Sequence, residues 1–274
     1  MDNLATIVKN FFDSRDRGDS SDAKKYFIDM VSARNELAKS KNEANYLTLQ
    51  LNQIYKIPAE DYNNYLQSKS SFALRFNPKL DNISNTPHFL SQIPTVKEIS
   101  HQEILTLLGN PTILDKITFA TSETTASFKY NQNTDSYTVS IPNGVSSNQK
   151  LAMTIHELAH VVTHELAKNQ FNSIYESEKQ ALKLELEVTR QISPKLYKSD
   201  IREYLMCFVN VDFQVDLFTG QVEGITSQYS KYILKYLGKP TDQFARSWTD
   251  NEKISMKPLS DLPYAVALCN LLKK

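Results

Sequence analysis

The segment LAMTIHELAHVV, residues 151–162, says more about the fold than any other part of the chain. It places His156 and His160 four residues apart, so on a helix both imidazoles leave the same face one turn apart. The remaining residues are apolar on nearly every side, which is typical of a buried helix. Burying polar groups without partners is costly, and a metal ion removes that cost. Two imidazole nitrogens at this spacing suit one zinc ion at about 2.0–2.1 Å.

Glu157 follows the first histidine and completes the pattern H-E-x-x-H. Its side chain lies beside the face that carries both histidines, so it can reach a water molecule at the metal without being a ligand. A carboxylate in that place takes the proton from the water that the metal activates. We therefore expect a hydrolytic site with one zinc ion per chain.

A catalytic zinc normally has three protein ligands and one open position. The next predicted helix, residues 177–192, ends before Pro194 and offers Glu178 and Glu185 beside its apolar stripe. These two differ by only about 20° around the helix, so phase alone leaves open which is the ligand and which its hydrogen-bonded support. Glu187 faces the opposite, solvent side. His164 lies about 12 Å along the helix from His156, which is too far to share the ion.

Composition indicates a soluble, mostly helical protein. The chain has 274 residues, of which 41% are hydrophobic and only 6 are glycine. Lys plus Arg (31) equals Asp plus Glu (31), so the basic excess of a general nucleic-acid binder is missing. Two cysteines, no apolar leader and no apolar stretch of membrane-spanning length favour a cytoplasmic-type protein without membrane contact, while secretion by other signals stays open.

Hydrophobic periodicity predicts the order of elements. We expect a long helix over residues 22–55, another from about residue 59, loop over 76–99, and a helix over 100–108. Two alternating segments, 126–130 and 136–141, flank a polar turn and predict a β-hairpin. Helices resume near residue 148. The expected organisation is an N-terminal helical lobe, 1–115, and a catalytic lobe, 116–274, in one continuous globular unit.

Three features together resemble the thimet oligopeptidase and oligopeptidase F family of zinc peptidases. They are the two glutamates seven residues apart after H-E-x-x-H, the segment SARNELAK followed by Asn45 and Tyr46, and the segment GITSQYSKY at residues 224–232. The resemblance covers about residues 30–237, and the chain is much shorter than the family's usual members. It implies a zincin-like (gluzincin) helical fold with a small sheet or hairpin beside the metal helix.

The resemblance also assigns roles. It implies Glu185 as third zinc ligand and Glu178 as its support, although Lys179, Gln180 and Ala181 replace the family's small residues between them. It implies Tyr232 and the nearby Tyr229 as catalytic tyrosines, and Gly224 of the same segment as a substrate-binding residue. Two of the family's tyrosines are replaced by Ile225 and Ser230, and its upstream histidine has no counterpart.

The leading hypothesis is a zinc metallopeptidase that is similar to the oligopeptidases and acts on a peptide or protein substrate. In it the strand with Tyr137, Thr138 and Val139 lies beside the cleft and pairs with the substrate backbone. Tyr232 donates to the developing oxyanion. The alternatives are a narrow-specificity protease that cleaves one partner protein and a non-catalytic, metal-stabilised helical interaction module. The tyrosines near residue 230 can also be an ordinary packing stripe.

Overall fold

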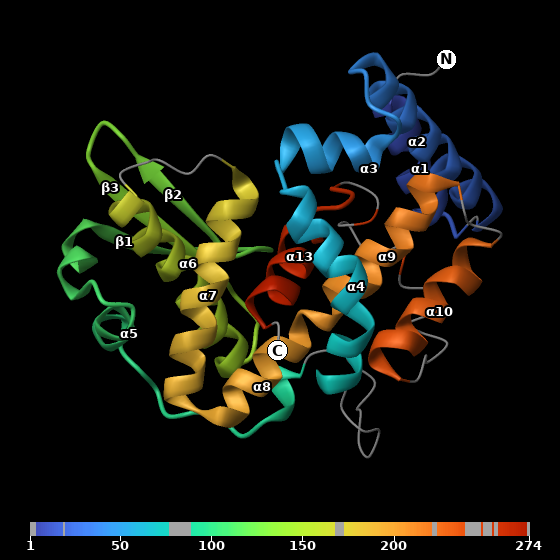
Figure 1. The fold of residues 1–274 in the computed structure, drawn as a ribbon. Coiled ribbons are helices and arrows are strands. Elements are labelled where there is room, and N and C mark those ends of the chain that lie inside the picture. Colours follow the sequence, from blue (N-terminus) through green and yellow to red (C-terminus); the bar gives the residue numbers. More distant parts are fainter. Residues whose placement is uncertain are drawn as a thin grey trace. The chain divides into compact units, whose positions relative to one another are not determined.

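The computed structural model describes residues 4–18, 20–76, 89–167, 173–220, 224–238, 248, 254 and 257–272. This part of the chain is mostly helical with one small sheet, as the sequence predicts (Figure 1). It divides into unit 1, Met1–Asn85 with Leu205–Val266, and unit 2, Thr86–Tyr204 with Ala267–Lys274. The boundary predicted after residue 115 falls inside unit 2, because the chain leaves unit 1 near residue 85 and returns to it at residue 205.

The sheet of unit 2 has three strands in the order β1-β3-β2, namely β1 Ile117–Ser122, β2 Ser127–Asn131 and β3 Ser136–Pro142. β2 and β3 form the predicted antiparallel hairpin, in which Phe128 lies opposite Val139. β1 was not among the predicted elements and pairs in parallel with β3. β3 is therefore the central strand, and β1 and β2 are the edges.

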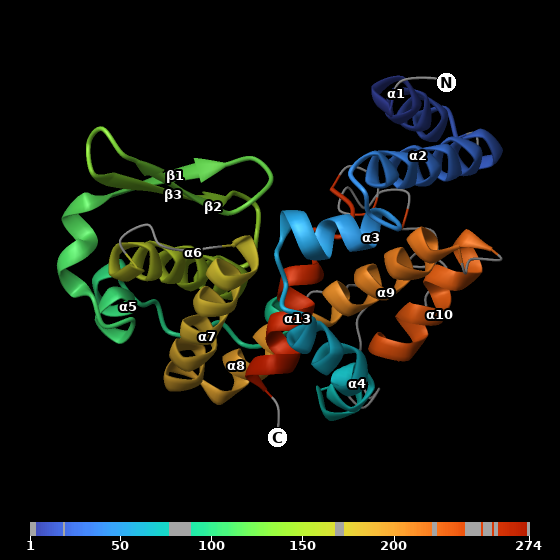
Figure 2. The same ribbon diagram turned by 45° about the horizontal axis from the view of Figure 1, so that its top comes forward.

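Helices complete unit 2, and two of them carry the predicted metal ligands. The sheet lies against one side of α6, and α7 packs along α6 away from the strands (Figure 2). The helices are α5 His101–Leu107, α6 Ser147–Ala167, α7 Ile174–Ile192 and α8 Pro194–Glu203, with 3₁₀ turns η2 Leu90–Gln92 and η3 Pro111–Lys116.

The core beneath the sheet explains why α6 is apolar on nearly every side. Ile155, Leu158 and Val162 of α6 are fully buried. They share one core cluster with Tyr137 and Val139, which point from β3 towards the helix. Burial of this kind is worth about 1.5–3 kcal/mol per large apolar side chain and holds α6 between the sheet and α7.

Polar residues define where the helices of unit 2 begin. Ser100 forms a capping box with Glu103 at the start of α5, as expected for a helix beginning at residue 100. Ser193 ends α7, and its hydroxyl caps α8, whose first residue is Pro194. Of the loop predicted over residues 76–99, residues 77–88 lie outside the described part of the chain.

The regular elements in the described part of unit 1 are all helices. Its elements are α1 Leu4–Asp16, α2 Ser20–Ser40, α3 Tyr46–Leu49, the π-helical turn η1 Gln50–Ile54, α4 Ala59–Phe76, α9 Leu205–Thr219 and α10 Ile225–Leu237. A further helix, α13 Leu262–Leu271, crosses the division between the units. Among the described helices, none has both the length and the apolar character that a membrane span requires.

Residues 22–55 do not form the single helix predicted for them. α2 ends at Ser40, and Asn42 takes a left-handed backbone conformation with φ of 60°. Asn45 then starts α3, because its side chain accepts the backbone N–H of Thr48 in a capping box. The apolar period continues across this turn, and a residue pattern alone does not reveal the break.

α9 is the most deeply buried helix of unit 1 and carries a network of polar side chains. Asp212 accepts hydrogen bonds from Tyr65 at 2.8 Å and from Tyr236. It also forms ion pairs with Lys69 at 2.6 Å and Lys235 at 3.2 Å. Partners of opposite charge and hydroxyl donors thus compensate the cost of burying this carboxylate.

Candidate metal centre

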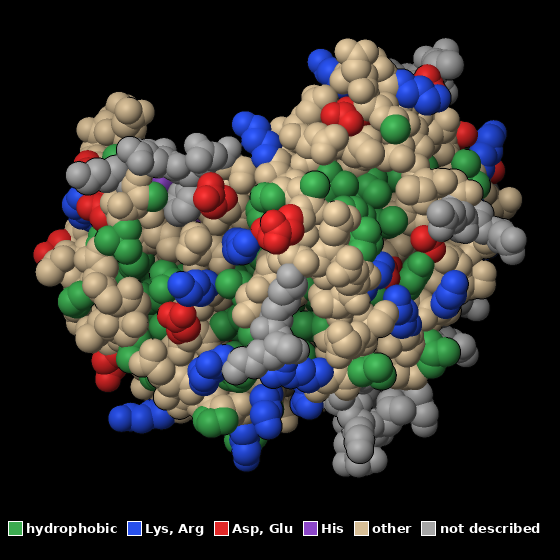
Figure 3. Space-filling model, viewed as in Figure 1, with side chains coloured by type: hydrophobic (Ala, Val, Ile, Leu, Met, Phe, Trp, Pro, Cys, Tyr) green, Lys and Arg blue, Asp and Glu red, His purple; other side chains and the backbone are tan. Residues whose placement is uncertain are grey.

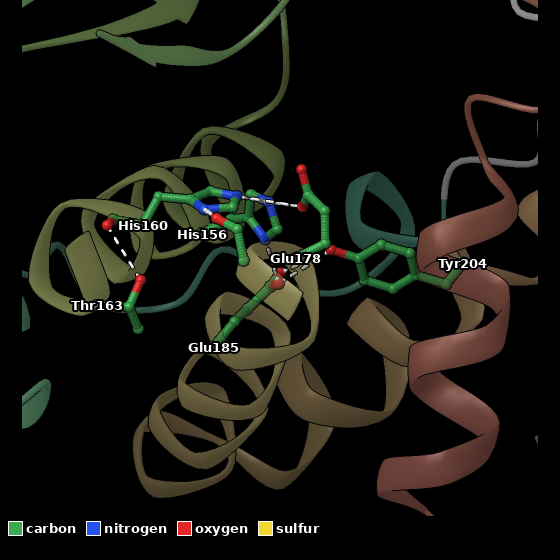
Figure 4. Close-up of polar contacts among 7 residues, drawn as sticks. His156, His160, Thr163, Glu178, Glu185 and Tyr204 are labelled. Carbon is green, nitrogen blue, oxygen red and sulfur yellow. Dashed lines mark hydrogen bonds and ion pairs between the residues drawn. The ribbon is translucent and has the colours of Figure 1, made fainter. Parts of the chain in front are cut away.

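His156 and His160 of α6 point into one polar cluster with Glu178 of α7 (Figure 4). Nε2 of His156 and Nε2 of His160 lie 3.1 Å apart. Oε2 of Glu178 lies 3.1 Å from Nε2 of His160 and 3.4 Å from Nε2 of His156. The helical spacing of the histidines thus brings their imidazoles together, as predicted.

These three atoms are placed so that they could hold one metal ion. Three atoms separated from one another by 3.1–3.4 Å all lie about 2 Å from a common point, which is the usual Zn–N and Zn–O distance. Two imidazoles and one carboxylate match the ligand set of catalytic zinc sites and leave a fourth position open. Within the described residues this is the group found to converge on a possible metal position.

The second nitrogen of His156 is held by Glu185. Nδ1 of His156 lies 2.8 Å from Oε2 of Glu185. A proton on Nδ1 can be donated to this carboxylate, which leaves the lone pair of Nε2 for a metal. The hydroxyl of Tyr204 in turn donates to both oxygens of Glu185, at 3.2 and 2.9 Å.

His160 is held in a similar way by two other residues. The hydroxyl of Ser177, at the start of α7, lies 3.2 Å from Nδ1 of His160. The ring of Phe128 from β2 stacks on the imidazole with a centroid distance of 5.0 Å and an interplanar angle of 11°. Both histidines therefore have a fixed ring plane and a partner for the nitrogen that faces away from the cluster.

Of the two glutamates, Glu178 and not Glu185 has a carboxylate oxygen near both Nε2 atoms. Glu178 lies with the metal-facing nitrogens, whereas Glu185 lies at Nδ1 of His156, at a different corner of the ring. Glu185 is also the more buried of the two, with its side chain 2% exposed against 16% for Glu178. The seven-residue spacing puts both carboxylates beside the histidines, and contacts to neighbours decide which one turns towards Nε2.

The histidines and glutamates of the cluster shift one another's pKa values. Burial opposes protonation of His156, but Glu185 and Glu178 outweigh it and raise the pKa of this histidine well above its ordinary value. Burial likewise raises the pKa of Glu178, but the two histidines outweigh it and lower the pKa well below the usual range. The two carboxylates thus favour positive charge at His156, which is the kind of charge that a metal cation would supply.

Glu157 is buried next to the two histidines, with 7% of its surface exposed. Burial raises the pKa of its carboxyl group, and the neighbouring His156 and His160 partly oppose this. No hydrogen-bond partner for Glu157 is found among the described residues. Its carboxylate is therefore free to accept a proton, which is the property that the predicted general base requires.

Asp200 of α8 extends the cluster behind Glu185. It is 2% exposed, and its Oδ2 atom has no hydrogen-bond partner among the described residues. Burial and the adjacent Glu185 carboxylate raise the pKa of Asp200 well above its ordinary value. Asp200 thus adds a second buried carboxyl group beside Glu185.

The predicted tyrosine segment belongs to unit 1. The hydroxyl of Tyr232 donates to Asp216, and that of Tyr229 lies 3.3 Å from Oδ1 of Asn210. Burial and Asp216 raise the pKa of Tyr232. Gly224 lies just before α10, where an added Cβ would come within 2.8 Å of Oγ of Ser227. Both tyrosines are buried and hydrogen-bonded to α9.

The substrate-binding role predicted for β3 does not agree with the sheet. β3 has paired strands on both sides, so the backbone around Thr138 is not available for another strand. Tyr137 and Val139 are 2% and 0% exposed, and the hydroxyl of Tyr137 donates to Glu165. His164, which was expected outside the ligand set, lies 3.0 Å from this hydroxyl. The described edge strand that packs on α6 is β2.

Several residues around the histidines were not identified from the sequence. The alternation of the hairpin gives a signal for Phe128, since it puts this side chain on the same face as Tyr130. No sequence signal points to Tyr204, because a helix break at Pro194 separates it from Glu185.

Histidine surface is nearly absent from the face drawn in Figure 3, where acidic and basic side chains are both widely distributed.

No protein-family model matches the sequence, and no curated protein matches it. Two solved structures are similar in fold. A carboxypeptidase of Pyrococcus furiosus has a TM-score of 0.64 at 11% identity, over 98% of this chain and 64% of the other. An oligoendopeptidase F of Bacillus anthracis has a TM-score of 0.50 at 12% identity, over 93% of this chain and 57% of the other. The chain thus spans about three fifths of each relative and has their zincin-like, mostly helical fold with a small sheet.

Proposed function

We propose that this protein is a zinc-dependent peptidase that cleaves peptide bonds in the manner of the oligopeptidases. The observation that supports it best is the convergence of His156, His160 and Glu178 beside the buried carboxylate of Glu157. A zinc ion held there would polarise the peptide carbonyl and lower the pKa of a water molecule. Both similar structures are named as peptidases, which agrees with this chemistry.

The protein residues have separate roles in this proposal. His156, His160 and Glu178 hold the ion, and Glu157 takes the proton of the attacking water and passes it to the leaving amine. The free edge of β2, next to α6, offers backbone groups with which an extended peptide can pair. The family resemblance adds Tyr232 as a donor to the oxyanion, and this role requires its hydroxyl to leave Asp216.

The decisive experiment combines metal content with hydrolysis. The purified protein should contain about one zinc per chain, and the double variant His156→Ala/His160→Ala should contain none. Glu157→Gln should keep its zinc but lose hydrolysis of a mixed peptide library by several orders of magnitude, because an amide cannot accept the proton. Glu187→Gln, on the exposed side of α7, is the matched control and should retain full activity.

The outcomes separate the three hypotheses. Cleavage of many peptides supports the proposal, while cleavage of one partner protein alone indicates the narrow-specificity protease. Bound zinc without any hydrolysis indicates the interaction module. Wild-type turnover in zinc-loaded Glu157→Gln would exclude Glu157 as the base.

A further inference from the structure

Tyr204 is connected to the candidate metal position by a chain of contacts through one carboxylate. It follows α8 and is half-buried, and its hydroxyl donates to both oxygens of Glu185. Glu185 contacts Nδ1 of His156 at 2.8 Å, and Nε2 of the same ring belongs to the converging group (Figure 4). None of the roles assigned so far uses Tyr204.

The position of Glu185 depends on the groups that contact its carboxylate, which include Nδ1 of His156 and the hydroxyl of Tyr204. Its carboxylate is 2% exposed, so water cannot replace lost partners, and a buried carboxylate needs hydrogen bonds to remain charged and in place. A hydrogen bond from Nδ1 to a carboxylate orients the imidazole and makes Nε2 a stronger ligand. A donor that fixes this carboxylate therefore acts on the metal ligand without touching the metal.

We propose that Tyr204 is a positioning residue of the metal centre, and that it sets zinc affinity by holding Glu185 against Nδ1 of His156. The inference rests on the proposed zinc site. The hydroxyl of Tyr204 lies 3.2 Å from Oε1 and 2.9 Å from Oε2 of Glu185, and Oε2 also lies 2.8 Å from Nδ1 of His156. Nδ1 of His160 contacts the neutral hydroxyl of Ser177 instead. Of these two histidines, therefore, only His156 has a carboxylate at Nδ1.

The test measures zinc affinity by competition with a chromophoric chelator, which needs no activity. Tyr204→Phe removes only the hydroxyl and should weaken zinc binding about 10–100-fold, the usual effect of losing a partner of a ligand. Tyr197→Phe is the matched control, because Tyr197 is also half-buried and aromatic in α8 but its hydroxyl accepts a bond from Arg190 at 2.7 Å. It should bind zinc as the wild type does.

A double-mutant cycle separates positioning from a general structural role. If Tyr204 acts through Glu185, the variant Tyr204→Phe/Glu185→Ala should bind zinc no more weakly than Glu185→Ala alone. Losses that multiply would overturn the proposal, and so would wild-type affinity in Tyr204→Phe. If Glu185→Ala does not fold, as judged by circular dichroism, the same cycle is run with Glu185→Gln.

A spectroscopic measurement checks the intermediate step. In zinc-loaded protein labelled with ¹⁵N-histidine, the Nδ1 proton of His156 should resonate downfield and move upfield in Tyr204→Phe but not in Tyr197→Phe. An unmoved proton would overturn the proposal. Zinc retained by His156→Ala/His160→Ala would instead reject the zinc site itself, so the two failures are distinguishable.

Discussion

His156 and His160 of α6 each direct their two ring nitrogens towards different partners. Nε2 faces the other histidine and Glu178, while Nδ1 contacts Glu185 in one case and Ser177 in the other. A neutral imidazole carries one proton, and an acceptor at Nδ1 such as the Glu185 carboxylate keeps that proton on Nδ1. The identity of the residue at Nδ1 therefore determines how well Nε2 can bind a cation.

The choice between Glu178 and Glu185 as the third ligand is open to direct measurement. Glu178→Ala should weaken zinc binding more than Glu185→Ala does, because it removes an atom that would touch the ion, whereas Glu185 acts through His156. A zinc titration of both variants gives the ranking. The opposite ranking would restore Glu185, which the family resemblance selects, as the ligand.

Tyr232 offers a second test at the level of a single side chain. If its hydroxyl donates to the developing oxyanion, Tyr232→Phe should lower kcat by about 10²–10³ with little change in KM, since such a bond forms mainly in the transition state. Tyr229→Phe should cost less. Steady-state kinetics on one fluorogenic peptide measures both effects. If kcat of Tyr232→Phe changes only a few-fold, Tyr232 has no catalytic role, and its hydroxyl serves only the hydrogen bond to Asp216.

The sequence determines some residues of the site and leaves others undetermined for a physical reason. A spacing of four puts His156 and His160 on one helical face whatever surrounds them. Glu178 and Glu185 differ by only about 20° in phase, so their side-chain directions depend on Tyr204 and the histidine rings, which come from other helices. Tyr204 itself follows no pattern that a single sequence reveals.

Among the elements, those set by local signals were predicted and those set by distant partners were not. The hairpin of β2 and β3 follows from alternation and a polar turn. β1 pairs with β3 in parallel, and this register depends on tertiary contact rather than on a connecting turn. Because β1 was not predicted, β3 was expected to have an unpaired edge at which a substrate could bind. In the structure β1 occupies that edge.

α9 provides a prediction at the level of an element. Asp212→Asn removes the charge that pairs with Lys69 and Lys235, and should lower the free energy of unfolding by on the order of 3 kcal/mol. Urea denaturation measures this loss. Asp115→Asn, at an exposed site, is the control and should change little. An equal effect of both substitutions would show that the α9 network does not stabilise the protein.

The stabilisation from Asp212 should depend on pH with a definite sign. Burial alone would raise the pKa of its carboxyl group, but Lys69 and the other donors outweigh it and lower the pKa below the ordinary value. The contribution is therefore present above about pH 4, the unfolded-state pKa, and is lost as pH falls through the folded-state pKa. The difference between wild type and Asp212→Asn should narrow below pH 4, and a difference that widens there would contradict the assignment.

At the scale of the whole molecule, the chain builds its units from discontinuous segments. Tyr204 is the last residue of unit 2 and Leu205 the first of the returning part of unit 1, and no glycine or proline lies between α8 and α9. Composition shifts and flexible residues are the signals by which a sequence reveals a boundary. A boundary between two adjacent helices shows neither a composition shift nor a flexible residue. The sequence therefore predicted one domain boundary, after residue 115, and not the return to unit 1 at Leu205.

Zinc should stabilise the folded protein because the proposed ligands come together only when α6 and α7 pack. A ligand that binds the folded state alone adds about 2.7 kcal/mol at 100 times its dissociation constant. Guanidinium unfolding with excess zinc should therefore have a higher midpoint than unfolding with a chelator, while magnesium in place of zinc should give a smaller shift, since imidazole ligands favour zinc. The double variant His156→Ala/His160→Ala should show the same midpoint under all three conditions. A zinc-induced shift that survives in this variant would mean that the stabilising ion binds elsewhere, and the convergence of the three ligand atoms would then have a structural explanation without metal.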